Sequence, residues 1–159
     1  MLEKISEIFI KNKLTLSTAE SCTAGGISSK LCSLPGASNY FKGSVVAYSN
    51  KIKIDFLGVS YDDIINYSEV SKQVSLSMSE LVSKKFNSDF SISTTGYAGP
   101  EGKDVGKVFV SIKTPINNKC SEFFFNGNRS EIINKTINKA LDELLSEINL
   151  YILMKSKRN

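Results

Sequence analysis

The sequence contains no histidine, and this absence restricts the hydrolytic chemistry that the chain can perform. In most serine hydrolases and cysteine hydrolases, a histidine removes the proton from the attacking group. A hydrolase without histidine needs another base, and a lysine held in its neutral form is the usual substitute. The first feature to look for is therefore a serine and a lysine that the fold can bring together.

Cysteine is scarce as well. The chain has three cysteines, at Cys22, Cys32 and Cys120, and they are widely spaced with no Cys-x-x-Cys pair. An odd number at such spacing, without histidine, argues against a zinc site and against a disulfide framework. The pattern is typical of a protein in a reducing compartment, and we expect a cytoplasmic location.

Long apolar runs are also missing. No stretch approaches the ~20 consecutive apolar residues that a membrane span requires. The amino-terminal segment has acidic residues, Glu3 and Glu7, within its apolar pattern, unlike the apolar core of a signal peptide. We therefore expect a soluble protein with no membrane partner.

The positive charge is concentrated at the carboxyl end. The net charge is +4, but Lys155, Lys157 and Arg158 lie among the last five residues with no acidic residue beside them. The rest of the chain is nearly neutral, which argues against an extended nucleic-acid surface. We expect the basic tail, from about residue 152, to be a solvated end.

The hydrophobic pattern predicts an α/β fold. A length of 159 residues suits a single domain, spanning 1–159. Apolar residues recur at helical spacing in five segments and alternate or cluster as in strands in five others. The expected helices are 2–12, a segment around 27–31, 51–57, 74–86 and 132–144, and the expected strands are 14–18, 44–48, 90–94, 107–113 and 122–125. Helices separating the early strands imply parallel crossovers, and the later hairpin adds an antiparallel strand. The prediction is a three-layer α/β/α sandwich on a mixed, mostly parallel five-stranded sheet.

One stretch combines serines with lysines, between Gly36 and Lys53. In the helix predicted there, Lys51 lies four residues before Asp55 and can pair with it on the solvated face. Lys53 shares a face with Phe56 and Leu57 instead, and apolar neighbours are what a neutral lysine needs. A lysine on the edge of an apolar face can equally extend its ammonium to water. The spacing alone leaves the serines at positions 38, 44 and 49 as equal candidates for the nucleophile.

A second stretch, Ala19-Glu-Ser-Cys-Thr-Ala-Gly-Gly26, joins a predicted strand to a predicted helix. Such a turn can direct backbone N–H groups at an anion. It can also be an ordinary tight turn that Ser21 or Thr23 caps. Cys22 we interpret as a small buried residue, since no histidine is present to form a thiolate pair with it.

Four motifs stand in a fixed order: Thr18-Ala-Glu-Ser-Cys-Thr-Ala-Gly-Gly26, Tyr48-Ser-Asn-Lys-Ile-Lys53, Thr95-Gly-Tyr-Ala-Gly-Pro100 and Gly127-Asn-Arg129. Together they resemble the CinA carboxy-terminal-domain family, the nicotinamide-nucleotide amidohydrolases. The likeness covers the chain from about Leu2 to Leu145. It implies a three-layer α/β/α sandwich, in agreement with the order of elements above.

The resemblance also implies a reaction. A member of this family is expected to hydrolyse the carboxamide of nicotinamide mononucleotide to nicotinate mononucleotide and ammonia, with a serine and a lysine and without a metal or cofactor. Carried over by motif, the nucleophile falls on Ser38 and the base on Lys53. The substrate-binding positions are Ser21, Thr23, Tyr48, Thr95, Gly96 and Arg129.

Several questions stay open at this point. The phosphate can lie at the helix start after Ser21 or on Arg129, and the oxyanion can be held near Ser38 or in the loop 95–99. A pyridine nucleotide is the expected small-molecule partner, and a homo-oligomer is possible. Two other functions remain: a catalytically silent nucleotide-binding or interaction module of the same fold, and an amidase with another small amide substrate.

The sequence departs from the family pattern at the expected rim of the ligand site. The loop after Gly99-Pro100 is shorter than usual, and Asp104 stands where a proline commonly precedes Val105-Gly106. Asn128 replaces the acidic residue usual before Arg129. Both differences bear on substrate preference.

Overall fold

The structure is a computed structural model that describes residues 1–157. Its five strands form one sheet in the order β2-β1-β3-β4-β5. Their bounds are β1 (Leu16–Glu20), β2 (Phe41–Val46), β3 (Phe90–Gly96), β4 (Lys107–Lys113) and β5 (Asn118–Phe124). β1 is parallel to both β2 and β3, whereas β4 is antiparallel to β3 and to β5. Four strands therefore run in one direction and β4 runs against them, which confirms the predicted mixed, mostly parallel sheet.

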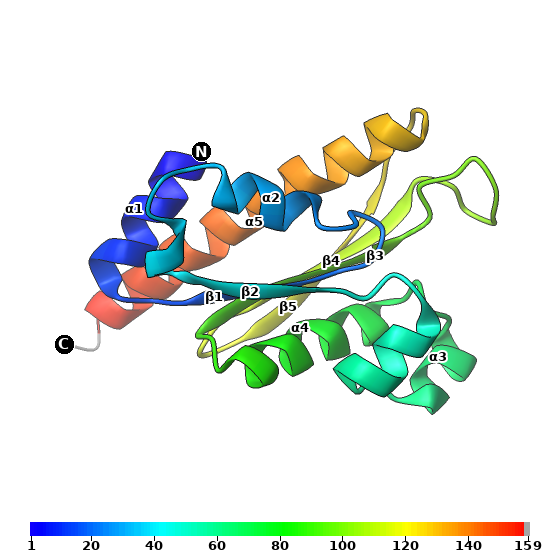
Figure 1. The fold of residues 1–159 in the computed structure, drawn as a ribbon, viewed down its shortest axis with the longest axis horizontal. Helices are drawn as coiled ribbons and strands as arrows, with labels where there is room; N and C mark the ends of the chain where they lie inside the picture. The colour runs from blue at the N-terminus through cyan, green and yellow to red at the C-terminus, as the bar shows by residue number, and fades with distance from the viewer. Residues whose placement is uncertain (158–159) are drawn as a thin grey trace.

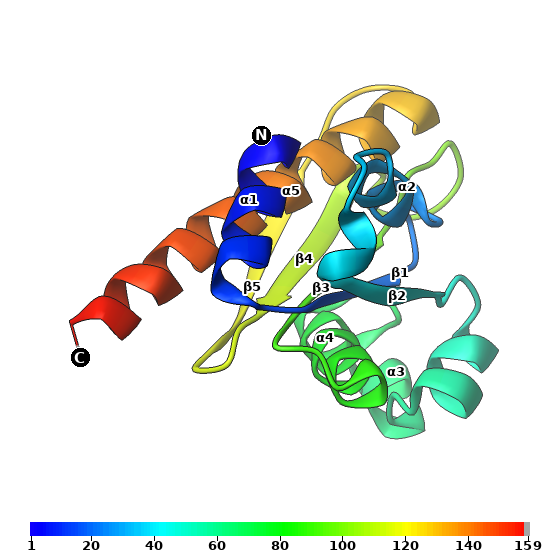
Figure 2. The same cartoon turned by 60° about the vertical axis from the view of Figure 1, so that its left-hand side comes forward.

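Helices cover both faces of this sheet (Figure 1). The α-helices are α1 (Leu2–Asn12), α2 (Gly26–Cys32), α3 (Tyr61–Tyr67), α4 (Lys72–Phe86) and α5 (Arg129–Ser156). A turn of 3-10 helix, η1 (Ala37–Asn39), precedes β2, and a π-helical turn, η2 (Ile52–Leu57), follows it. Figure 2 shows α1, α2 and α5 on one face and α3 and α4 on the other, so the predicted three layers are confirmed.

The two faces bury different side chains. The face under α1, α2 and α5 is packed by the larger apolar cluster, which includes Phe9, Phe90 and Leu141. The face under α4 also contains a layer of buried hydroxyls, in which Ser75 on α4 is hydrogen-bonded to Ser93 on β3 and to Ser111 on β4. Because these hydroxyls satisfy one another, they can be buried without the desolvation penalty of unpaired polar groups.

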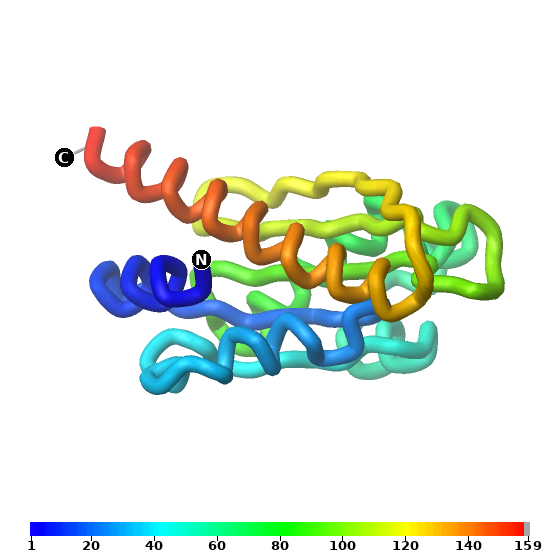
Figure 3. Tube along the Cα trace, turned by 90° about the horizontal axis from the view of Figure 1, so that it is seen from above, coloured from blue at the N-terminus to red at the C-terminus, as the bar shows by residue number. Residues whose placement is uncertain are grey.

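The bounds of several elements differ from the sequence-based prediction. β1 begins and ends two residues later than the predicted strand 14–18, and β2 begins before the predicted strand 44–48 and ends at Val46. α5 continues through Ser156, so the predicted solvated tail from about residue 152 is helical over most of its length. Figure 3 shows α5 crossing the sheet obliquely. Arg158, part of the predicted tail, lies outside the described residues.

The sheet geometry fixes where a ligand can bind. After the carboxyl end of β1, the chain passes to α2 on one face of the sheet. After β2, it passes to η2, α3 and α4 on the other face (Figures 1 and 2). In open α/β sheets, ligands bind in the crevice that opens where neighbouring strands connect to opposite faces. Over residues 1–157, no helix combines the length and the apolarity needed to cross a membrane.

Candidate active site

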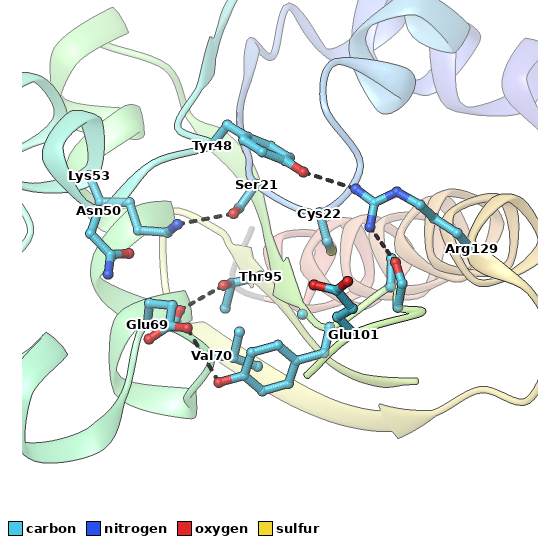
Figure 4. A pocket seen from close by; sticks show the side chains of 14 residues that line it. Ser21, Cys22, Tyr48, Asn50, Lys53, Glu69, Val70, Thr95, Glu101 and Arg129 are labelled. Carbon is cyan, nitrogen blue, oxygen red and sulfur yellow. Dashed lines mark hydrogen bonds between the residues drawn. The ribbon is translucent and has the colours of Figure 1, made fainter. Parts of the chain in front are cut away.

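A cavity of about 360 Å³ opens at this crevice (Figure 4). This volume is sufficient for a small-molecule ligand. The lining comes from the segments after β1 and β2, the segment between α3 and α4, the end of β3 and the loop that follows it, and the first residue of α5. The lining residues are Ser21, Cys22, Tyr48, Asn50, Lys53, Glu69, Val70, Thr95, Gly96, Tyr97, Ala98, Gly99, Glu101 and Arg129.

Lys53 and Ser21 meet on one side of this cavity. The Nζ atom of Lys53 lies 3.0 Å from Ser21 Oγ and donates a hydrogen bond to it. Ser21 is the first residue after β1, and its own N–H donates to the carbonyl of Thr94 on β3. The serine is thus held by the sheet, and the lysine lies within proton-transfer distance of it.

A π-helical turn places Lys53. The carbonyl of Lys53 accepts hydrogen bonds from the N–H groups of Gly58 and Val59, at 3.0 and 2.8 Å, and this widens the turn. Single π turns of this kind occur frequently at functional sites. The apolar face predicted for Lys53 is present only in part: Leu57 is buried, but the side chain of Phe56 is 55% exposed and lies under the ammonium of Lys85.

Lys53 is almost completely buried, with 1% of its surface exposed. Burial lowers the pKa of Lys53, and the charge of Glu69 and the thiol of Cys22 oppose this effect more weakly. The cause is desolvation, which disfavours the ammonium form of a buried lysine. This shift favours the neutral amine, the form in which a lysine beside a serine can accept a proton.

Cys22 is the other nucleophilic atom in the cavity wall. Burial raises the pKa of its thiol to about 12. The thiolate is the reactive form of cysteine, and at neutral pH this site holds almost none of it. Its burial agrees with the interpretation of Cys22 as a small buried residue.

Glu20, which the sequence analysis did not single out, organises the turn that presents Ser21. Its side chain is fully buried. One carboxylate oxygen accepts from the N–H groups of Gly25 and Ile27 at 3.1 and 3.0 Å, and the other accepts from the N–H of Ser28 at 2.8 Å. The N–H groups at the start of α2 are therefore already bound to a carboxylate of the protein itself. The anion site predicted as one possibility at this helix start is wrong for that reason.

The side chain of Thr23 also makes its hydrogen bonds to other residues of the protein. Its hydroxyl donates to Glu20 Oε2 at 2.7 Å and shares a hydrogen bond of 2.8 Å with Thr94. The side chain is buried and is not part of the cavity lining. Thr23, predicted to bind substrate, thus supports the Glu20 cluster.

Arg129 and Tyr48 form the outer wall. One guanidinium nitrogen of Arg129 donates to the carbonyl of Gly99 at 2.6 Å, and another donates to the hydroxyl of Tyr48 at 2.9 Å. Asn128, the residue that departs from the family pattern, caps α5 by accepting from the N–H of Glu131 at 3.1 Å. Asn128 therefore fixes the helix start that carries Arg129, a role that its side-chain oxygen fulfils without a negative charge.

Thr95 and Gly96, at the end of β3, form the floor of the cavity. The Thr95 hydroxyl donates to the backbone carbonyl of Glu69 at 2.7 Å and so ties the segment between α3 and α4 to the sheet. Figure 4 shows Glu69 and Arg129 on opposite sides of the cavity, with Ser21 and Thr95 between them.

Ser38 lies away from this site. It belongs to η1, which precedes β2, whereas Lys53 follows β2. The six residues of β2 span about 20 Å at ~3.3 Å each, and this length lies between η1 and the turn that carries Lys53. η1 adjoins the amino ends of β1 and β2, where the N–H of Leu16 donates to the carbonyl of Tyr40. Ser38 is exposed and is absent from the cavity lining. The geometry thus separates Ser38 from Lys53 and pairs Lys53 with Ser21, the residue predicted only to bind substrate.

Sequence reasoning did not identify four further residues of the cavity wall, Asn50, Glu69, Val70 and Glu101, and it included Tyr97 only as part of the loop 95–99. Asn50 and Tyr97 lie within the quoted motifs, so their positions were a usable signal. The segment around Glu69 carries no motif, and only the fold brings it to the cavity.

The shortened loop after Pro100 has a conformation of its own. Asp104 has φ of 57°, in the left-handed region. Proline is fixed near φ of about −65°, so a proline at this position is incompatible with the loop as it is folded here. Asp104, which replaces the usual proline, therefore fits the backbone conformation of this loop.

The structure is thus a three-layer α/β/α domain in which a buried lysine is hydrogen-bonded to a serine in the ligand crevice. Within residues 1–157, no three potential ligands among cysteine, aspartate and glutamate are grouped to hold a metal ion. The family model for the CinA C-terminal domain matches residues 1–148. The chain belongs to the CinA C-terminal-domain family.

Individual relatives agree with this assignment. The chain is 43% identical to a CinA-like protein of Flavobacterium psychrophilum over 148 residues, which is 91% of this chain and 35% of the relative. A putative competence-damage inducible protein of Clostridium botulinum is 40% identical over 146 residues, 89% of this chain and 36% of the relative. The chain spans about a third of the length of these curated relatives.

Solved structures show the same fold. The competence/damage inducible protein CihA of Agrobacterium tumefaciens superimposes with a TM-score of 0.89 at 32% identity, covering 93% of both chains. A CinA superfamily protein of Escherichia coli superimposes with a TM-score of 0.88 at 30% identity, covering 91% of this chain and 86% of the other.

Proposed function

We propose that this protein hydrolyses the carboxamide of nicotinamide mononucleotide to nicotinate mononucleotide and ammonia, with Ser21 as nucleophile and Lys53 as base. The observation that carries the proposal is the hydrogen bond of 3.0 Å between Lys53 Nζ and Ser21 Oγ, made by an almost fully buried lysine. The family resemblance supplies the substrate, and the location of the pair at the strand ends supports a ligand site there.

In the acylation step, Ser21 Oγ attacks the carboxamide carbon while the neutral Lys53 amine takes the hydroxyl proton. The resulting Lys53 ammonium then gives this proton to the departing amino group as the C–N bond breaks. Ammonia leaves, and an ester joins Ser21 to the nicotinoyl carbon. A water molecule, deprotonated by Lys53, then attacks the ester and releases the carboxylate product with Ser21 restored.

The developing oxyanion needs donors close to Ser21. The N–H groups of Cys22 and Thr23 follow Ser21 directly, and neither is hydrogen-bonded to another residue in the described part of the chain. Buried N–H groups without acceptors are rare and call for a functional explanation. Because Cys22 lines the cavity and Thr23 does not, we assign oxyanion stabilisation to the N–H group of Cys22.

The substrate phosphate is assigned to Arg129. The guanidinium has no acidic partner among the described residues and contacts only the Gly99 carbonyl and the Tyr48 hydroxyl, so a charge-assisted bidentate contact with a phosphate is open to it. Glu20 occupies the other anion site that the sequence suggested.

The test is ammonia release by the purified protein from nicotinamide mononucleotide, from nicotinamide riboside and from nicotinamide. We expect turnover of the mononucleotide and a large loss of kcat/KM on removal of the phosphate. Equal turnover of all three compounds would indicate an amidase with another substrate. Tight binding of the mononucleotide by calorimetry without ammonia release would indicate a nucleotide-binding module and refute the proposal.

A further inference from the structure

Glu69 is a half-buried residue of the cavity wall that the mechanism above does not use. Each of its two carboxylate oxygens accepts one hydrogen bond, from Ser68 Oγ at 3.2 Å and from the hydroxyl of Tyr97 at 3.4 Å. A carboxylate oxygen can accept about two hydrogen bonds. Each oxygen of Glu69 therefore has capacity for a further donor, which a ligand in the cavity can supply.

Glu69 lies near Lys53 without contacting it. Figure 4 shows both side chains on the same side of the cavity, opposite Arg129. The charge of Glu69 acts on Lys53, whose pKa it raises against the larger effect of burial. Within residues 1–157, however, no ion pair joins the two groups within 4.0 Å. The carboxylate thus stands beside the pair of Lys53 and Ser21 and is not bound to either of them.

The proposed reaction determines which part of the substrate comes to this side of the cavity. With the phosphate on Arg129 and the carboxamide carbon at Ser21, the ribose and the ring lie on the Arg129 side of Ser21. The carbonyl oxygen turns toward the N–H of Cys22. The amino group is therefore the substituent that faces Lys53, from which it receives its proton. Its N–H groups are hydrogen-bond donors, and Glu69 offers a charged acceptor on this side.

We propose that Glu69 recognises the amino group of the carboxamide and makes the site selective for the amide over the corresponding carboxylic acid. This inference rests on the proposed function, which sets the orientation of the substrate. In the product, an oxygen of a carboxylate takes the place of the amino group, so a hydrogen bond is replaced by repulsion between two carboxylates. An unfavourable charge contact of this kind rejects the wrong ligand, and here it also favours release of the product.

The experiment compares the binding of two ligands that differ in this one group. Dissociation constants of nicotinamide mononucleotide and of nicotinate mononucleotide are measured by calorimetry with Ser21→Ala, which stops turnover, and with Ser21→Ala/Glu69→Gln. Glutamine keeps the size of the side chain and removes the charge. We expect the double variant to bind the acid about tenfold more tightly and the amide no more tightly, because the repulsion of two charges in a partly desolvated site is lost.

Two other effects of the substitution can be separated from this one. Loss of the Glu69 charge lowers the pKa of Lys53, and a less positive Lys53 attracts a carboxylate less, so this effect opposes the expected gain. Glu101→Gln is the matched control, because Glu101 is an exposed residue of the same wall, in the loop that Arg129 contacts at Gly99. It removes a charge near the proposed phosphate site, which both ligands occupy alike. The ratio of the two dissociation constants should therefore stay unchanged.

The outcomes separate this inference from the proposed function. Failure of the Glu69→Gln variant to bind the acid more tightly would overturn the inference, and equal weakening of both ligands would show that Glu69 only supports the wall. The same change of ratio in Glu101→Gln would overturn it too, as a general effect of charge. Ammonia release by the wild-type protein without the gain in acid binding would leave the proposed function standing. Binding of neither nucleotide would refute the proposed function and this inference with it.

Discussion

Two turns of this protein share a sequence character but lie at opposite ends of the sheet. The turn after β1 contains Ser21 and Gly25, and the turn before β2 contains Gly36 and Ser38. Gly25 and Gly36 have nearly equal φ of 92° and 88°, and each begins a short helix. Only the first turn lies at the carboxyl ends of parallel strands, and only the first is tied to a buried carboxylate, that of Glu20. The position of a serine in the sheet, more than the residues next to it, determines whether it can react.

The largest expected effect separates these two turns directly. Ser21→Ala should lower kcat on nicotinamide mononucleotide about 10³-fold or more, since removal of a nucleophile leaves only binding and oxyanion stabilisation. Ser38→Ala should keep activity within about twofold, because Ser38 contacts no part of the cavity. Ammonia release at saturating substrate measures both. Loss of activity in Ser38→Ala together with retained activity in Ser21→Ala would restore Ser38 as nucleophile and require a large rearrangement of η1.

Much of the fold followed from hydrophobic periodicity, because helices and strands that bury one face impose a period on the sequence. β4 matches the predicted strand 107–113 at both ends. The spacing of Lys53 to Leu57 placed the lysine on an apolar face but left open whether its ammonium reaches water, and the structure buries it. The exposure of Phe56 was not foreseen, because a regular helix of 3.6 residues per turn places Phe56 on the same side, whereas a π-helical turn rotates it away.

The roles of Ser21 and Glu20 could not be predicted from hydrophobic periodicity. Ser21 and Lys53 are 32 residues apart, and only the strand order makes them neighbours. Glu20 lies at the end of a strand, where a charged residue ordinarily indicates that the side chain is exposed to solvent. Its burial depends on three backbone N–H groups that the following turn supplies, and no local pattern reports that contact.

A substitution at Glu20 provides the second test of the difference between the two turns. Glu20→Gln replaces one acceptor oxygen by an amino group facing the N–H donors of the turn, which leaves buried donors unpaired. We expect a loss of about 2–4 kcal/mol in the free energy of unfolding, measured by urea denaturation. Glu7→Gln, on the exposed surface of α1, should change it by less than about 0.5 kcal/mol. A neutral result for Glu20→Gln would show that the turn holds Ser21 without its carboxylate.

The pH dependence of activity tests the base. Lys53 accepts a proton only as the neutral amine, so kcat/KM should fall about tenfold per pH unit below the pKa of Lys53 in the free protein. Burial lowers this pKa, and the charge of Glu69 raises it by a smaller amount. Glu69→Gln should therefore move the acidic limb of the profile to lower pH. A limb that moves to higher pH, or an activity independent of pH, would contradict the role of Lys53 as base.

The smallest expected effect compares two lysines that are two residues apart. In unfolded chains a lysine has a pKa near the ordinary value of 10.5, and folding lowers that of Lys53. The unfolded state therefore binds more protons between the folded pKa and about 10.5, so stability falls as pH falls through this window and remains reduced below it. Lys53→Met should remove this cost and raise stability by about 1 kcal/mol, or the Tm by about 3 °C, while abolishing activity.

Lys51 provides the matched control, because it is exposed and its hydrogen bond to Asp55 raises its pKa. Lys51→Met should give no increase in Tm at pH 7. The gain from Lys53→Met should also disappear above about pH 10.5, where lysine is neutral in both states. A destabilised Lys53→Met would mean that the hydrogen bond to Ser21 outweighs the desolvation of the ammonium. In that case Lys53 would be held in its charged form, and the proposed base would have to be sought elsewhere in the cavity.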